Sequence, residues 1–298
     1  MKITVASGKG GTGKTTVATN LAYTASRDGQ SVAFLDCDVE EPNSQIFLKA
    51  EINQSEPVHR VVPKVDEEIC TLCGECGEIC QYSAIACIGE KVLVFPELCH
   101  ACGGCWLVCP VDAISEVPRV VGRLERGRAD SIQFVQGLLN IGEAMSPPVI
   151  RAVKSNAPEA ALEIVDAPPG TSCPVIESIR GTDYVILVTE PTPFGLNDLQ
   201  LAVEMVRALQ MPFGVVINRA DLGDDEVRQY CHRNRIDILA EIPDDRRIAE
   251  AYSEGKMICR ALPEYESLFA SLLKQIAEKV SDRGKEYVAK GNPSSARA

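Results

Sequence analysis

The most constraining feature of the sequence is a glycine-rich loop between a short apolar segment and a helix-like segment. Residues 2–6, KITVA, are typical of a buried strand, and SGKGGTGKTT follows them directly. Residues 8–15 match the pattern G-x-x-x-x-G-K-[ST] at every defined position. In that pattern, main-chain N–H groups surround a phosphate chain and the helix N-terminus adds positive potential. The sequence therefore predicts a nucleotide-binding α/β domain.

Two lysines within the loop have separate predicted roles. Lys14 is placed to reach the outer phosphates, and Thr15 to bind Mg²⁺. Lys9 gives the pattern K-G-G-x-G-K-T-T, which resembles the deviant Walker A motif of the MinD, ParA, Mrp and nitrogenase iron protein superfamily. This resemblance implies an ATPase that is slow without its partner, and an ATP-dependent homodimer in which Lys9 reaches the nucleotide of the second subunit. The expected nucleotide contacts in the loop are Gly8, Lys9, Gly10, Gly11, Thr12, Gly13, Lys14, Thr15 and Thr16.

Acidic side chains follow two further predicted strands. SVAFLDCDVEEPN ends a strand with Asp36 and Asp38, and ALEIVDAPPG ends another with Asp166 and, four residues later, Gly170. A carboxylate at the end of a strand can hold a metal-bound water, and the Gly170 N–H can contact a γ-phosphate. The resemblance implies that Asp38 orients the attacking water and that Asp166 belongs to the Walker B segment. The predicted catalytic residues are Lys9, Lys14, Asp38 and Asp166.

The sequence allows two roles for Asp36 and for Asn218. Asp36 is either functional or a residue that caps the loop. FGVVIN ends a strand in Asn218, and LAEIP ends the next at Pro243. The resemblance places Asn218 and Pro243 beside the adenine of the nucleotide. For Asn218 the alternative is an asparagine that stabilises a turn.

Eight of the 13 cysteines form a tandem repeat. The spacing C-x2-C-x2-C-x3-C occurs twice, 29 residues apart, and each copy is followed by an Ala-Ile pair. The repeat resembles a bacterial ferredoxin with two [4Fe-4S] clusters, in which the fourth cysteine of each run binds the other cluster. The ligands implied by this resemblance are Cys70, Cys73, Cys76 and Cys109 for one cluster, and Cys99, Cys102, Cys105 and Cys80 for the second.

The alternatives for the eight cysteines are zinc sites or disulfides. Zinc ribbons use paired C-x2-C units, and cytoplasmic disulfides are rare, so iron–sulfur clusters fit the spacing better. Pro110 matches the usual C-P ending of the motif, whereas Gln81 departs from it. Cys173 lies seven residues after Asp166 and is either a redox or metal contact across a dimer or a small buried residue that packs the loop.

The charge and hydropathy of the chain exclude some functions. A formal net charge of -12 argues against binding to nucleic acid or to an anionic membrane surface. No apolar run is long enough to cross a bilayer, and MKITVASGKGG does not resemble a signal segment, so we expect a cytoplasmic protein. Apolar residues at helical spacing between Tyr265 and Val280 predict a core helix rather than a membrane-binding helix.

Alternating strands and helices predict a doubly wound, mostly parallel P-loop sheet with an inserted α+β ferredoxin-like module. The expected parts are residues 1–57 and 123–282 for the ATPase domain, 58–122 for the insert and 283–298 for a polar, disordered tail. ATP, Mg²⁺ and two [4Fe-4S] clusters are the expected cofactors. We expect ATP hydrolysis to control electron transfer from the clusters to a partner protein. The alternative is an ATP-dependent scaffold or carrier of iron–sulfur or heterometal clusters, whose partner accepts the cluster.

Overall fold

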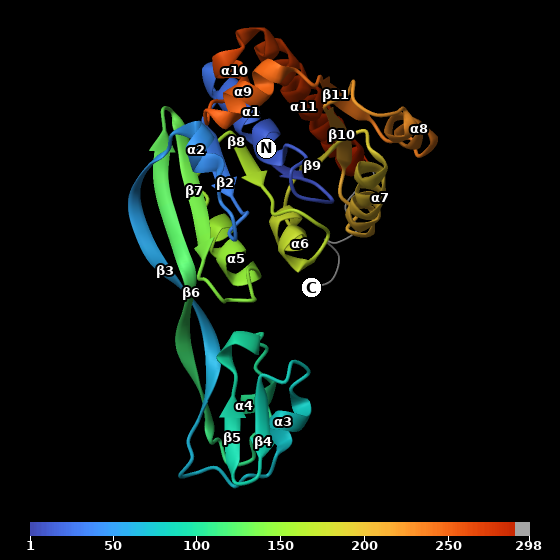
Figure 1. Ribbon diagram of the computed structural model, residues 1–298. Helices are drawn as coiled ribbons and strands as arrows, with labels where there is room; N and C mark the ends of the chain where they lie inside the picture. Colours follow the sequence, from blue (N-terminus) through green and yellow to red (C-terminus); the bar gives the residue numbers. More distant parts are fainter. Residues whose placement is uncertain (290–298) are drawn as a thin grey trace.

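A nine-stranded sheet forms the centre of the computed structural model, which describes the backbone of residues 1–289 and the side chains of residues 1–282 (Figure 1). The strand order is β11-β10-β9-β1-β8-β2-β7-β6-β3. The bounds are β1 (Lys2–Ala6), β2 (Val32–Asp36), β3 (Glu51–Val65), β6 (Ile114–Ala129), β7 (Ile132–Leu139), β8 (Leu162–Asp166), β9 (Tyr184–Thr189), β10 (Phe213–Asn218) and β11 (Ile238–Ile242). All neighbours from β11 to β7 are parallel, and β6 is antiparallel to both β7 and β3. The predicted mostly parallel α/β sheet is confirmed.

Helices cover both faces of the parallel part of the sheet. They are α1 (Lys14–Arg27), α2 (Ser44–Leu48), α5 (Pro147–Ser155), α6 (Cys173–Ile179), α7 (Pro193–Ala208), α8 (Glu226–Arg233), α9 (Arg246–Ser253), α10 (Ile258–Ala261) and α11 (Glu266–Ala289), with a 3₁₀ turn η2 (Pro263–Tyr265) before α11. Helices α1, α10 and α11 pack on one face, and α5, α6, α7 and α8 on the other. Strands β2, β8 and β9 are buried along their whole length, which explains their unbroken apolar sequences.

Strands β3 and β6 form a long antiparallel ribbon that extends beyond the sheet (Figure 1). Residues 66–113 lie at the far end of this ribbon and form a small lobe. Its elements are α3 (Glu75–Ile79), β4 (Ile85–Ile88), β5 (Lys91–Val94), the 3₁₀ turn η1 (Pro96–Leu98) and α4 (Gly104–Leu107). The expected limits of the insert, Val58 and Gly122, are opposite each other in the ribbon, and both strands continue past these limits, with a shift of register between Val58 and His59.

The last helix, α11, belongs to the core. Phe269, Leu272 and Ile276 are buried, and Tyr265 and Val280 pack against the same cluster. This is the core helix that the apolar spacing predicts. The helix continues to Ala289, into the segment expected as a tail, and residues 290–298 lie outside the described residues. Within the described residues, no helix is both long and apolar enough to span a membrane.

Candidate functional site

The predicted phosphate-binding loop connects β1 to the first turn of α1. Gly11 and Gly13 have φ values of 80° and 94°, a region that side chains with a Cβ rarely adopt. A Cβ on Gly13 would also lie 2.5 Å from Nδ2 of Asn218. That amide donates a hydrogen bond of 2.9 Å to the carbonyl of Thr12. Asn218, the last residue of β10, therefore stabilises the loop through this hydrogen bond. Glycine at position 13 leaves the space that the asparagine side chain occupies.

Helix α7 and the segment after β8 also contact the loop. A Cβ on Gly8 would lie 2.1 Å from the main-chain oxygen of Asp198 in α7, so this position has room only for glycine. The N–H of Gly170 donates to the carbonyl of Ser7 at 2.9 Å. The predicted contact between Gly170 and a γ-phosphate would require this hydrogen bond to break, and it stays a prediction.

Asp36, Asp38 and Asp166 gather beside Lys14 at the carboxyl ends of β2 and β8. Burial, followed by the neighbouring Asp166, raises the pKa of Asp36 to about 8. Burial also raises the pKa of Asp166, while Lys14 opposes the shift, and it raises the pKa of Asp38 to about 6. Because neighbouring buried carboxylates repel each other, positive charge such as that of Lys14 favours their ionised form.

Ser44 links the two fully buried carboxyl groups. Its hydroxyl donates to Asp166 Oδ2 and its N–H donates to Asp36 Oδ2, both at 3.1 Å. Asp36 also accepts the N–H of Asp38 at 3.1 Å, so it stabilises the loop that carries Asp38. Asp166 Oδ1 is buried and has no hydrogen-bond partner among the described residues. An unpartnered carboxylate oxygen beside a phosphate-binding loop fits a Mg²⁺-bound water.

A cavity of about 390 Å³ opens over the loop. The predicted residues that line it are Gly10, Gly11, Gly13, Lys14, Thr15, Thr16, Asp38, Asn218 and Pro243. The predicted residues Gly8, Lys9, Thr12, Asp166 and Gly170 do not line it. Lys14 and Thr15 are buried, whereas Lys9 is half-buried and outside the cavity. The structure thus places most of the predicted nucleotide contacts around one space.

The eight repeated cysteines line two separate cavities in the lobe. Cys70, Cys73, Cys76 and Cys109 line one cavity, which we call the first cage. Cys80, Cys99, Cys102 and Cys105 line the other, the second cage. In each cage the fourth thiol comes from the other repeat, as the ferredoxin resemblance implies. Within the described residues, no group of three or more His, Cys, Asp or Glu side chains is arranged to bind a single metal ion.

The two cages repeat the same backbone geometry. Left-handed φ angles occur at three pairs of positions 29 residues apart. These pairs are Leu72 and Ala101, Gly74 and Gly103, and Ser83 and Asp112. Such angles are rare at residues other than glycine, so their repetition shows that each cysteine run adopts the same loop.

Main-chain N–H groups point at three of the cage sulfurs. Ala84, Ala101 and Ala113 donate to Cys80, Cys99 and Cys109 at 3.3, 3.3 and 3.2 Å. Donors aimed at sulfur stabilise the thiolate form, which is the form that binds iron. All 13 cysteines are free of disulfides, so the disulfide alternative finds no support in this structure. The set of four thiols in each cage fits the ligand requirement of an iron–sulfur cluster.

Comparison with known proteins assigns the fold to a family. The model of the family described as "CobQ/CobB/MinD/ParA nucleotide binding domain" matches residues 3–258. The chain belongs to this family. The predicted superfamily is therefore confirmed, whereas the clusters of the inserted lobe stay a prediction.

Individual relatives of this family member span nearly its whole length. The uncharacterized protein MJ0578 of Methanocaldococcus jannaschii is 30% identical, covering 95% of this chain and 97% of the relative. The "Iron-sulfur cluster carrier protein" of Pyrococcus horikoshii is 26% identical, covering 96% and 90%. Among solved structures, the septum site-determining protein MinD of Pyrococcus horikoshii, complexed with Mg-ADP, has a TM-score of 0.56 at 19% identity, covering 92% of this chain and 95% of that one. This structural likeness shows the shared fold.

The cavity over the loop also includes residues that the sequence analysis did not predict. These are Glu41, Asn43, Pro169, Arg219, Asp244, Asp245, Ile248, Ala249 and Tyr252. Asp245 caps the start of α9 by accepting the N–H of Arg247 at 2.8 Å, and Tyr252 lies one to two turns further along that helix. The D-D that follows Pro243 is a helix-start signal, and it could have directed attention to α9.

Cys173 lies outside both cages, at the first residue of α6. Its side chain is exposed, so the alternative of a small buried packing residue is wrong. The segment before α6 is a surface turn that faces solvent at this position. The contact of Cys173 with a second subunit stays a prediction. Cys37, Cys231 and Cys259 are buried.

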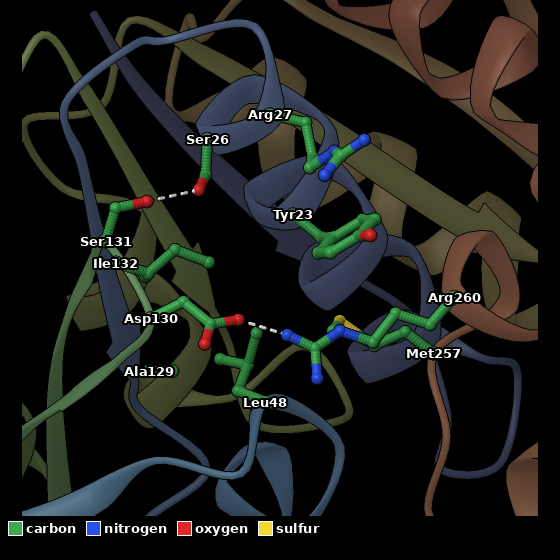
Figure 2. Close-up of a pocket in the computed structure, with 10 residues that line it drawn as sticks. All are labelled: Tyr23, Ser26, Arg27, Leu48, Ala129, Asp130, Ser131, Ile132, Met257 and Arg260. Carbon is green, nitrogen blue, oxygen red and sulfur yellow. Dashed lines mark hydrogen bonds and ion pairs between the residues drawn. The ribbon is translucent and has the colours of Figure 1, made fainter.

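Another cavity, of about 390 Å³, lies at the opposite edge of the sheet (Figure 2). It is bounded by the end of α1, by α10 and by the turn between β6 and β7. Ser26 and Ser131 form a hydrogen bond of 2.6 Å across one side, and Arg260 pairs with Asp130 across the other. The amino ends of β2 and β7 lie here, so this cavity is remote from the phosphate-binding loop.

Proposed function

We propose that this protein binds and hydrolyses ATP to control the delivery of iron–sulfur clusters from its lobe to an acceptor protein. The observation that carries the proposal is the pair of four-thiol cages on a ribbon that is continuous with a P-loop sheet. Several relatives at 24–26% identity are named "Iron-sulfur cluster carrier protein", which favours this function over electron transfer.

The cages would hold the clusters through thiolates contributed by both repeats. The residues are Cys70, Cys73, Cys76 and Cys109 in the first cage, and Cys80, Cys99, Cys102 and Cys105 in the second. A thiolate-bound cubane can accept one electron or be passed to other thiolates. Burial raises the pKa of Cys76, and that of Cys105 to about 11, so these two thiols need iron to lose their protons near neutral pH.

The nucleotide would bind in the cavity above the loop, with Mg²⁺ on Thr15 and on water held by Asp166. Lys14 would neutralise the phosphates. Asp38, with a pKa of about 6, is mostly ionised at neutral pH and can accept a hydrogen bond from the attacking water. The MinD structure complexed with Mg-ADP supports this choice of ligand. The family resemblance supports a dimer in which Lys9 reaches the partner's nucleotide.

A second candidate function is nucleotide-controlled electron transfer to a partner protein. Each cage supplies four thiols, and three of the sulfurs accept main-chain N–H groups. A fully ligated cluster of this kind is suited to reversible reduction without loss of iron. The geometry of the cages, rather than the comparisons, favours this candidate.

One experiment separates the two functions. The protein is reconstituted with ⁵⁷Fe and sulfide under anaerobic conditions and mixed with an apo-ferredoxin, with and without ATP and Mg²⁺. We expect ⁵⁷Fe to appear in the acceptor, with its ferredoxin absorption, about tenfold faster with ATP. The Lys14→Ala variant should lose this acceleration. Retention of all iron, together with a nucleotide-dependent change in reduction potential, would instead establish electron transfer, and a protein that binds only zinc would exclude both functions.

A further inference from the structure

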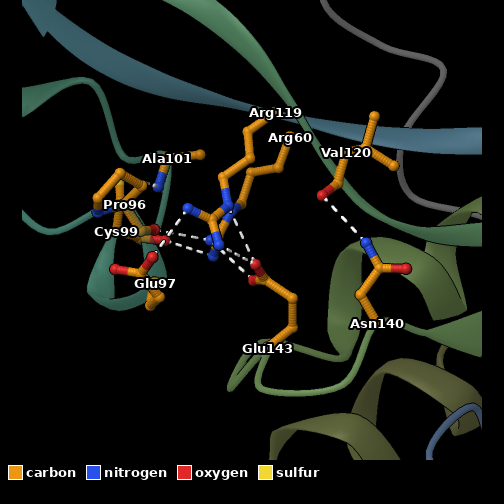
Figure 3. A network of polar contacts seen from close by, with 9 residues as sticks. All are labelled: Arg60, Pro96, Glu97, Cys99, Ala101, Arg119, Val120, Asn140 and Glu143. Carbon is orange, nitrogen blue, oxygen red and sulfur yellow. Dashed lines mark hydrogen bonds and ion pairs between the residues drawn. The ribbon is translucent and has the colours of Figure 1, made fainter.

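A buried ionic network anchors the lobe to the ATPase domain (Figure 3). Glu143, in the loop after β7, lies between Arg60 of β3 and Arg119 of β6. The carboxylate is 3.3 Å from Arg60 Nη2, and it accepts Arg119 Nε at 3.0 Å. The side chains of Arg60 and Glu143 are only 2% and 3% exposed. Separating this carboxylate from its guanidinium partner would leave two buried charges with neither a partner nor water, which is costly, so the ion pair keeps its geometry.

One end of the network reaches the main chain of the second cage. Arg60 donates to the carbonyl of the cage residue Cys99 and, at 2.9 Å, to that of Pro96. Arg119 pairs with Glu97 at 3.0 Å. Arg60 therefore holds the 3₁₀ turn η1, which leads directly into Cys99, whereas Arg119 adds only a pair with the half-exposed side chain of Glu97. Among the described residues, neither arginine contacts Cys70, the repeat equivalent of Cys99 in the first cage.

The other end of the network reaches the loop that carries Asp38. Val39, the next residue, accepts the N–H of Leu139 at 2.8 Å. Asn140 follows and donates its N–H to Val121 in the ribbon at 3.0 Å, and its carbonyl accepts the N–H of Glu143 at 3.1 Å. Val39 and Val121 are also buried in the same apolar cluster. A chain of hydrogen bonds and packed side chains thus runs from the nucleotide cavity to Glu143.

We propose that Glu143 is a positioning residue through which the loop at Asp38 sets the conformation of the second cage and leaves the first cage little affected. This inference rests on the proposed nucleotide site and cages. A displacement of Val39 moves the Leu139–Glu143 segment, because main-chain hydrogen bonds join them. Arg60 and the turn before Cys99 then move together with Glu143, because the buried carboxylate stays paired with the guanidinium groups.

The first test uses the full-length protein as purified. Hydrogen–deuterium exchange of residues 96–101 and 67–72 is measured with and without a non-hydrolysable ATP analogue and Mg²⁺. We expect nucleotide to change the exchange rate of 96–101 about fivefold or more, with a smaller change at 67–72. Glu143→Gln should abolish the nucleotide effect at 96–101 and leave nucleotide affinity unchanged. Glu97→Gln, which breaks only the exposed pair with Arg119, is the matched control and should behave as the wild type.

The second test uses the reconstituted protein and the reduction potentials of its two clusters. Nucleotide should shift one potential more than the other, and Glu143→Gln should remove the larger shift. Should Glu143→Gln fail to fold, Glu143→Asp keeps the charge and withdraws it by one methylene, and we expect a reduced nucleotide effect. An unchanged nucleotide effect in either variant, or no effect in the wild type, would overturn the inference. If no cluster can be loaded, the proposed function fails, while the exchange measurement still decides the role of Glu143.

Discussion

Ser44 Oγ donates a hydrogen bond of 3.1 Å to Oδ2 of Asp166, and this contact joins the loop after β2 to the end of β8. Neither atom is exposed to water, and the other oxygen of Asp166 has no partner among the described residues. Ser44 therefore supplies one of the few contacts that stabilise this buried carboxyl group.

We expect Ser44→Ala to lower the free energy of unfolding of the nucleotide-free protein by about 1–3 kcal/mol, because a buried acceptor loses its hydrogen bond. Urea denaturation followed by circular dichroism measures the change. Ser131→Ala removes an exposed hydrogen bond with Ser26 and is the control, with an expected effect within about 0.5 kcal/mol. Equal effects of the two variants would show that Ser44 contributes no more than a surface hydroxyl.

Lys9 is half-buried and lies outside the cavity formed by its own subunit. If it acts on the nucleotide of a second subunit, Lys9→Ala should lower the rate of ATP hydrolysis about 100-fold or more, while nucleotide affinity changes far less. Phosphate release and light scattering with an ATP analogue measure the rate and the dimer. Lys64→Ala, on the exposed side of β3, is the control. Hydrolysis at the wild-type rate by a monomeric Lys9→Ala protein would contradict this role.

The residues of the nucleotide site differ in how well the sequence reveals them. Gly8 to Thr15 form one contiguous loop whose conformation is a local property, so the motif predicts it. Asp38 and Asp166 end strands, and parallel strands bring their carboxyl ends to one edge of the sheet. Ser44 and Tyr252 reach the site only through tertiary packing of α2 and α9, and no local pattern distinguishes them from other surface-helix residues.

The ribbon and its ionic network could not be predicted from the sequence, for a different reason. Residues 51–65 contain two prolines and mostly exposed side chains, because β3 is an edge strand, and so they lack the apolar alternation that reveals a strand. Glu143 lies in a segment with no motif. Its partner Arg60 is 83 residues earlier in the chain, and only the pairing of β3 with β6 brings them together.

Lys154 of α5 stabilises the end of α6. Its ammonium group donates to the carbonyls of Glu177, Ser178 and Arg180 at 2.7, 2.8 and 2.5 Å. A cation at a helix C-terminus satisfies carbonyls that have no partner in the helix and interacts favourably with the helix dipole.

We expect Lys154→Met to lower the free energy of unfolding by about 1–3 kcal/mol, since two partly buried carbonyls and one exposed carbonyl lose this donor. Chemical denaturation measures this change. The matched control is Lys274→Met on the exposed side of α11, which should change stability by less than about 0.5 kcal/mol. If Lys154→Met lowers the free energy of unfolding no more than the control does, water replaces the ammonium group without a loss of stability.

The crossed arrangement of the cages makes a prediction about pairs of variants. Cys109 lines the first cage with Cys70, and Cys99 lines the second. Cys109→Ala should cost the reconstituted protein about four iron atoms, the content of one cubane. Adding Cys70→Ala should cost no more iron, because both substitutions affect the same cage, whereas adding Cys99→Ala should remove the remaining cubane.

Iron and sulfide analysis, with electron paramagnetic resonance of the reduced protein, measures these losses. Cys87→Ala is the control, because Cys87 lines neither cage although it lies close to the first one, with its thiol 3.8 Å from the carbonyl of Leu72. Uncrossed cages would reverse the result: the pair Cys109→Ala and Cys99→Ala would then retain one cubane, because both residues belong to the same cysteine run. The comparison thus decides the ligand sets without depending on what the clusters do.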